Sequence, residues 1–163
     1  MANSANTGQV SRPPIRLYTD GAASGNPGPG GYGAVLECAG LRKELSGGFG
    51  MTTNNRMELL AVIEGLSAIR WDHAEVDVWS DSSYVVNAIN NGWLQGWLAK
   101  DFRKVKNPDL WHRLLPLLDR HLVRFHWIKG HAGHPQNERC DALAVAARSL
   151  PALPRDEGYA PEE

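Results

Sequence analysis

The apolar positions of the chain change their period several times along its length. In three early stretches they alternate with polar positions, which predicts strands at residues 15–19, 32–38 and 42–49. Only Ala39 and Gly40 separate the second stretch from the third, and a two-residue connection favours a hairpin. The sheet is therefore expected to begin with antiparallel strands.

A helical period follows over residues 54–70. The apolar residues that carry it are Leu59, Val62, Ile63, Leu66 and Ile69. Alternation returns at residues 75–80, which predicts a fourth strand, and residues 82–90 are typical of a further helix. Because a helix that connects two strands implies parallel pairing, the fourth strand is expected beside the first.

The second half of the chain predicts a helix that begins at Pro108, a strand at residues 122–129 and a last helix at residues 137–150. Pro116 should bend the first of these helices or end it early, since proline cannot donate a backbone hydrogen bond.

Two terminal segments are expected to lie outside the fold. Residues 1–14 are polar and predict a disordered leader, and residues 151–163 carry four acidic side chains against one arginine and predict a solvated, disordered tail. One α/β domain at residues 15–150 remains.

Composition narrows the class of protein. The chain has 163 residues, 42% of them hydrophobic and 21% charged, as in soluble globular proteins. Its net charge of −1 argues against nucleic-acid binding through overall positive charge. No apolar run approaches the roughly 20 residues of a membrane span, and no secretory signal is apparent. The cytoplasm is the expected compartment, so Cys38 and Cys140 are expected to be reduced.

Four acidic residues occupy positions that suit chemistry. Asp20 and Asp81 follow predicted strands, and Glu58 and Asp141 lie on predicted helices. Singly, Asp20 can be a turn residue, and Glu58 and Asp81 can cap helices; Asp141 is harder to explain, because aspartate is a poor residue for a helix interior. Together, the four can gather at one edge of the sheet.

Such an all-oxygen cluster suits Mg²⁺, or Mn²⁺ in its place, because clustered carboxylates repel one another unless a cation or a proton neutralises them. Two ions roughly 3.5 to 4 Å apart can activate an attacking water and stabilise the leaving oxygen of a phosphodiester. The cluster therefore indicates phosphoryl chemistry.

Other kinds of site fit less well. The glycine-rich stretch after Asp20 lacks the lysine and hydroxyl residue of a phosphate-binding P-loop. The spacing of His131, His134 and Cys140 matches no standard zinc pattern. His131 lies between Gly130 and Gly133 and suits a mobile general acid or base, although an exposed loop histidine without a role fits the same residues.

An aromatic and basic segment follows residue 92. Trp93, Trp97 and Phe102 are interleaved with lysine and arginine, which suits packing on sugars or bases together with phosphate contacts. The alternative is an amphipathic surface helix whose aromatic side chains belong to the core.

Four separated motifs resemble bacterial ribonuclease H of the single-domain type 1 class. They lie at residues 19–33, 52–59, 80–84 and 129–141, and the resemblance runs from about residue 15 to residue 150. It implies a ribonuclease H-like fold with a five-stranded mixed sheet, three antiparallel strands followed by two parallel ones, flanked by helices. It also implies a monomeric endonuclease that hydrolyses the RNA strand of an RNA–DNA hybrid and leaves 5′-phosphate and 3′-hydroxyl ends.

The resemblance assigns roles to matching positions. Asp20, Glu58, Asp81 and Asp141 would hold two Mg²⁺ ions, His131 would assist proton transfer or product release, and Glu58 would also contact a ribose 2′-hydroxyl. The residues expected to bind the hybrid are Gly21, Ala23, Gly25, Asn26, Asn54 and Asn55 in the minor groove and Thr53 and Asn107 at a DNA-strand phosphate, with Ser83 and Trp93 as further contacts. Only a strand with 2′-hydroxyls offers the extra hydrogen bonds.

The sequence also departs from the resemblance. Residues 97–111 resemble the family's basic protrusion but are shorter and less basic, which predicts weaker binding of the hybrid. Ser83 stands where glutamine is common. Two other functions share part of the pattern: a non-catalytic hybrid-binding module, for which the acids would be expendable, and a resolvase- or integrase-like nuclease, which would use other acid spacings.

Overall fold

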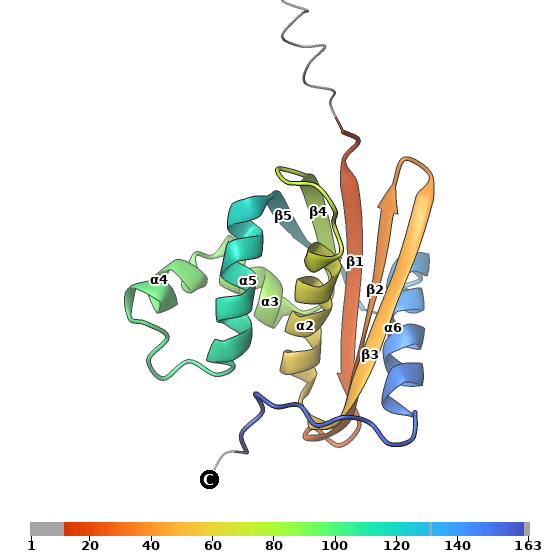
Figure 1. Ribbon diagram of the computed structural model, residues 1–163, viewed down its shortest axis with the longest axis vertical. Coiled ribbons are helices and arrows are strands. Elements are labelled where there is room, and N and C mark those ends of the chain that lie inside the picture. Colours follow the sequence, from red (N-terminus) through yellow and green to blue (C-terminus); the bar gives the residue numbers. More distant parts are fainter. Residues whose placement is uncertain (1–11, 131, 162–163) are drawn as a thin grey trace, which may run out of the picture.

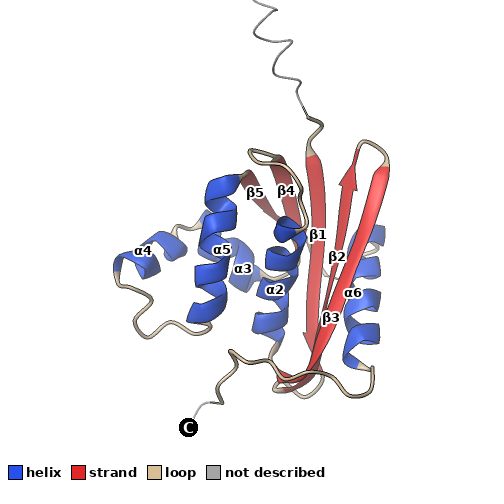
Figure 2. Ribbon diagram, viewed as in Figure 1, coloured by secondary structure: helices blue, strands red, loops and turns tan. Residues whose placement is uncertain are grey.

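A mixed β-sheet forms the centre of the protein. The computed structural model describes residues 12–130 and 132–161, and in this part of the chain the sheet has five strands in the order β3-β2-β1-β4-β5 (Figures 1 and 2). The strands are β1 (Ile15–Ala23), β2 (Gly28–Cys38), β3 (Leu41–Thr52), β4 (Glu75–Ser80) and β5 (Leu122–Trp127). β1, β2 and β3 pair antiparallel, and β1, β4 and β5 pair parallel. The predicted mixed sheet is confirmed.

The hairpin between β2 and β3 turns at Ala39 and Gly40, as the sequence predicts. Both residues have positive φ, 51° and 82°, which a tight two-residue hairpin requires. Cys38 pairs with Leu41 directly across the turn. The register of the two strands is therefore set at this end.

Helices cover both faces of the sheet. α2 (Asn54–Ser67) packs on one face and α6 (Pro135–Arg148) on the other (Figure 1). The alternation along β1 explains why both faces are apolar: Leu17 lies in the core beneath α2, and Tyr18 clusters with Cys140 of α6. Both cysteines are free thiols, as expected.

Three further helices follow α2. They are α3 (Ser83–Asn90), α4 (Trp93–Ala99) and α5 (Pro108–Arg120). Of these, α3 and α5 pack beside α2, and α4 packs against α3 (Figure 1). Of the two effects predicted for Pro116, a bend or an early end of the helix, the early end does not occur, because α5 continues to Arg120. One backbone hydrogen bond is lost at the proline, but Trp111 and Leu114 are fully buried and hold the helix in place.

The aromatic side chains of residues 93–102 differ in burial, and each of the two interpretations of this segment fits a part of them. Phe102 is buried, Trp97 packs edge-on against the buried Trp111, and Trp93 is 46% exposed. The segment therefore contributes to the core and still presents one indole ring at the surface.

The C-terminal tail is mostly exposed over residues 151–161, but it is tied to the domain at Pro154 and at the buried Asp156. After α6 the chain passes beneath β3 and β1 to the N-terminal end of α2 (Figure 1). Gly50 N–H donates to the carbonyl of Pro154 (3.0 Å), and Asp156 is buried against Arg56. The predicted leader falls mostly on residues 1–11, outside the described residues. In the described part of the chain, no helix has the length and apolar character needed to cross a bilayer.

Candidate active site

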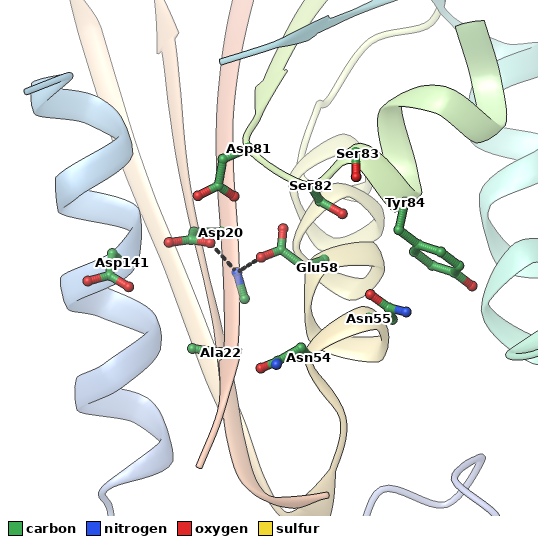
Figure 3. A pocket seen from close by; sticks show the side chains of 11 residues that line it. Asp20, Ala22, Asn54, Asn55, Glu58, Asp81, Ser82, Ser83, Tyr84 and Asp141 are labelled. Atoms are coloured by element: carbon green, nitrogen blue, oxygen red, sulfur yellow. Dashed lines mark hydrogen bonds between the residues drawn. The ribbon is translucent and has the colours of Figure 1, made fainter. Parts of the chain in front are cut away.

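Two parallel strands carry the first pair of acids to one point. In the register of β1 and β4, the last pair is Thr19 with Ser80, so Asp20, which lies inside β1, and Asp81, which follows β4, come side by side where the parallel pairing ends. Figure 3 shows their carboxyl groups facing each other across the mouth of the sheet. The prediction that parallel pairing brings these two residues together is confirmed.

Glu58 reaches the same point because β1 and α2 approach very closely. The N–H of Gly21 donates to Oδ1 of Asp20 (2.9 Å) and to Oε1 of Glu58 (3.0 Å). A Cβ at residue 21 would collide with the backbone of Met57 and Glu58. Glycine is therefore required for this contact between strand and helix.

The three acids form a compact group. Asp20, Glu58 and Asp81 each offer one carboxylate oxygen, and these oxygens lie within 4.8 Å of one another. Asp141 faces them from α6 across the same cleft, which has a volume of about 430 Å³ (Figure 3). All four predicted acids thus line one site, while His134 and Cys140 belong to no such group among the described residues.

Burial raises the free energy of the charged form of these carboxyl groups. Desolvation raises the pKa of Asp20 from 3.8 to about 7, and the negative charges of Asp81 and Asp141 add to the rise. Burial and the charge of Asp20 raise the pKa of Glu58 well above its ordinary value. Oε2 of Glu58 is buried and has no hydrogen-bond partner among the described residues. An all-oxygen donor set with an unsatisfied oxygen and repelling charges fits a hard divalent cation.

Several expected substrate-binding residues surround the acids. The N–H of Ala23 donates to Oδ1 of Asn54 (2.6 Å), and the N–H of Asn54 donates to Oδ1 of Asn26 (2.9 Å). These bonds tie the β1–β2 turn, which contains Gly25, to the start of α2. Asn54, Asn55 and Ser83 line the cleft beside the acids, as does Gly21.

His131 lies outside the described residues. Its neighbour Gly130 passes close to the site, since a Cβ at residue 130 would lie 2.7 Å from Oδ2 of Asp81. The chain therefore leads into residue 131 from the edge of the acidic group.

Comparison with known proteins decides the family. The family model described as RNase H matches residues 12–149. The chain belongs to the RNase H family. It is 55% identical over 150 residues to the ribonuclease H of Nitratidesulfovibrio vulgaris (strain DSM 19637 / Miyazaki F), a match that covers 89% of this chain and 96% of the relative. It is 58% identical over 147 residues to that of Desulforamulus reducens, with 87% and 92% covered. The resemblance drawn from the sequence motifs is confirmed.

Solved structures of the RNase H family have the same fold. LC9-RNase H1, a type 1 RNase H with the type 2 active-site motif, superposes with a TM-score of 0.77 at 31% identity, covering 85% of this chain and 74% of the other. LC11-RNase H1, solved in complex with an RNA/DNA hybrid, gives a TM-score of 0.59 at 29% identity, covering 82% and 95%. The chain is accordingly a nuclease of the RNase H family.

A second groove shares Asn55, at the start of α2, with the cleft of the acids. It has a volume of about 600 Å³, and Thr53 and Asn107, predicted to share a phosphate site, both line it together with Asn26. Trp93 lines neither this groove nor the cleft of the acids. Thr53 also caps α2, since its Oγ1 accepts the N–H of Arg56 (3.3 Å).

The sequence alone did not identify every residue at these sites. Tyr84 lines the cleft of the acids, and Arg56, Lys106 and Tyr159 line the second groove. Arg56 gave one available signal, because it lies two residues before Glu58 in the motif at residues 52–59. Tyr159 gave none, since it lies in a tail that the sequence predicted to be solvated.

Proposed function

We propose that this RNase H family nuclease hydrolyses the RNA strand of RNA–DNA hybrids at the cleft formed by Asp20, Glu58, Asp81 and Asp141, leaving 5′-phosphate and 3′-hydroxyl ends. The observation that carries the proposal is the group of three carboxylates within 4.8 Å, contributed by Asp20 of β1, Glu58 of α2 and Asp81 after β4. The relation to LC11-RNase H1, which was solved with a hybrid, supports the choice of substrate. Following the same resemblance, the enzyme acts as a monomer in the cytoplasm.

The four acids would hold two Mg²⁺ ions, or Mn²⁺ in their place. When bound with substrate, the ions supply charge neutralisation, activation of the attacking water and stabilisation of the leaving oxygen. The chain contributes the placement of the ligands: Gly21 N–H holds Asp20 and Glu58 together, and the β1–β4 register holds Asp81 beside them. His131, next to Gly130 at the edge of the group, would move a proton at the reacting phosphate or assist release of the product.

Selection of the RNA strand would come from the minor-groove side of the cleft. The side chains of Asn54 and Asn55, which line the cleft, and the backbone around Gly21, Ala23 and Gly25 would contact the 2′-hydroxyls, which DNA lacks. Asn26 holds the start of α2 in place for these contacts. Ser83 would add a contact to the RNA strand, and Trp93 would pack against the hybrid farther out.

One gel tests this function. End-labelled RNA–DNA hybrid, duplex DNA and duplex RNA are incubated with the protein and Mg²⁺, with and without a chelator. We expect cleavage of the RNA in the hybrid alone, loss of cleavage with chelator, and loss of cleavage in Asp20→Asn. Asp119→Asn removes the same charge from an exposed position on α5 and should cleave like the natural protein.

Each other outcome excludes a part of the proposal. Binding of hybrid without cleavage would indicate a non-catalytic module. Cleavage of duplex DNA would indicate a nuclease of another substrate class on this fold. Cleavage by Asp20→Asn at the rate of the natural protein would show that the reaction does not depend on the carboxylate of Asp20.

A further inference from the structure

Arg56 is a buried charge at the boundary between the two sites. It is 2% exposed, and all five N–H groups of its guanidinium have acceptors. Nε and Nη2 donate to Asp156 (2.7 and 3.1 Å), Nη1 and Nη2 donate to Asp109 (2.9 and 2.8 Å), and Nη1 also donates to Oδ1 of Asn107 (3.3 Å). A buried arginine held by two bidentate carboxylates has one fixed orientation.

One of the two carboxylates comes from the C-terminal strap, which we define as residues 154–161. The strap begins where the carbonyl of Pro154 accepts from Gly50 of β3, and Asp156 then accepts both from Arg56 and from Oγ1 of Thr52 (2.7 Å). Asp156 is therefore anchored to Thr52 of β3 and Arg56 of α2, which lie 104 and 100 residues earlier in the chain.

Beyond its anchor, the strap forms one wall of the second groove. Residues 158–161 line this groove together with Asn26, Pro27, Thr53, Lys106 and Asn107. Tyr159 follows a turn in which its N–H donates to the carbonyl of Asp156 (3.1 Å). The position of the wall thus depends on the position of Asp156.

Arg56 also fixes the amide of Asn107. A guanidinium has only donors, so the atom of Asn107 that faces it must be Oδ1. Nδ2 then points the other way and donates to the hydroxyl of Tyr84 (3.2 Å), which leaves the second amide hydrogen for a ligand. Asn107 has φ of 59° and ψ of 42° at the N-cap of α5, a left-handed conformation that asparagine tolerates.

The groove offers hydrogen-bond donors to an anion. Asn107 supplies an amide hydrogen, Thr53 a hydroxyl, Asn26 an amide and Lys106 an ammonium group, all from residues that line the groove. A phosphodiester of a nucleic-acid backbone matches this set of donors.

We propose that Asp156 and residues 158–161 of the C-terminal strap are a working part of the hybrid-binding surface, in which Asp156 is a positioning residue that acts through Arg56 to aim Asn107 at a phosphate of the DNA strand. Tyr159 forms the wall against which that strand lies. This inference rests on the proposed function, since it takes a hybrid as the ligand. It assigns to the tail a role in recognition that the predicted solvated tail would not have.

The test compares three variants of the full chain. Asp156→Asn removes the charge that holds Arg56, and Tyr159→Ala shortens the wall without touching the ion pairs. Glu157→Gln is the matched control, because it removes the same charge from the next residue, which is exposed. Steady-state cleavage is measured on an unmodified hybrid and on a series of hybrids in which one DNA phosphate at a time is a neutral methylphosphonate.

We expect the natural chain to show a raised KM when one particular DNA phosphate is neutral. Asp156→Asn should raise KM on the unmodified hybrid about tenfold and leave kcat within about twofold. For this variant, neutralising that DNA phosphate should raise KM no further, so the position-specific penalty in KM is lost. A merely structural role would change stability but keep the position-specific penalty. Tyr159→Ala should raise KM as well. It still tests the role of the strap if Asp156→Asn does not fold.

The outcomes separate this inference from the function on which it rests. If the natural chain cleaves the hybrid, and Asp156→Asn and Tyr159→Ala keep the KM and the phosphate penalty of Glu157→Gln, the strap has no part in recognition and the proposed function stands. If the natural chain leaves every hybrid intact, the proposed function itself fails.

Discussion

Asp20 is a residue at which function opposes stability. It is 6% exposed, and its charged form lies beside Asp81 and Glu58 in a group that suits a cation. Its pKa rises to about 7 from 3.8 because of burial and of the like charges of Asp81 and Asp141. In the absence of metal, the folded protein therefore holds a proton on Asp20 over a pH range in which the unfolded chain has lost it.

This difference predicts the behaviour of Asp20→Asn in metal-free buffer. Since the folded state binds more protons than the unfolded state, the stability of the natural chain falls as pH rises from about 4 to about 7. At about pH 8 the variant should melt on the order of 5 °C higher than the natural chain, because an uncharged amide replaces the buried charge. At about pH 4 the two midpoints should nearly coincide, since Asp20 is then protonated in the folded protein.

Calorimetry with chelator at the two pH values measures the effect. Added Mg²⁺ should raise the midpoint of the natural chain more than that of the variant. A variant that is less stable than the natural chain at the higher pH would contradict the repulsion within the carboxylate group.

At the scale of elements, the contact between β2 and α6 decides where Asp141 lies. A Cβ at Gly33 would collide with the carbonyl oxygen of Cys140, the residue that precedes Asp141 on α6. The helix can lie this close to the sheet only because the strand has no side chain there. This contact carries Asp141 to the cleft that holds the other three acids.

Gly33→Ala should therefore move α6 and destabilise the protein. We expect the free energy of unfolding to fall by about 3 kcal/mol, as for other overpacked cores, together with weaker binding of Mg²⁺. Gly96→Ala is the control, because Gly96 lies exposed in α4 and a Cβ there meets nothing within 4 Å. It should raise the free energy of unfolding by about 0.5 to 1 kcal/mol, as alanine does in a helix. Equal effects in chemical denaturation would refute the close contact.

At the scale of the whole molecule, positive charge is local. The net charge is −1, while Lys100, Arg103, Lys104 and Lys106 follow one another in the segment between α4 and α5. Such a cluster neutralises few phosphates, because each neutralised phosphate requires one nearby cation. The affinity for a hybrid should therefore depend only weakly on salt concentration.

We expect log affinity against log salt concentration to have a slope no steeper than about −4, measured with chelator so that the hybrid stays intact. Lys100→Gln should reduce the magnitude of the slope by about 1, whereas Lys43→Gln, on the exposed part of β3, should leave it unchanged. A slope as steep as that of a relative with a longer and more basic segment would contradict the prediction made from the shortened protrusion.

Much of the fold and of the acidic group follows from local pattern. The residues predicted for the fourth strand, 75–80, are those of β4, and the parallel pairing inferred from the helix that connects it to β1 places Asp81 beside Asp20. A helical or alternating period depends only on neighbouring residues, so strands and helices can be predicted from it without knowledge of the rest of the chain. An early end of α5 at Pro116 does not occur, because the burial of Trp111 and Leu114 by residues distant in sequence outweighs the local effect of a proline.

By itself, therefore, the sequence determined which segments become strands and helices, which four acids stand at the ends of strands or on the helices that cover them, and which family's motifs the chain carries. Only the tertiary structure decided that Asp156 closes on Arg56 and that the raised pKa values of Asp20 and Glu58 belong to one buried group. The physical reason is distance along the chain: an ion pair between residues a hundred positions apart and the loss of water around a carboxylate depend on which surfaces meet, and no local period records that.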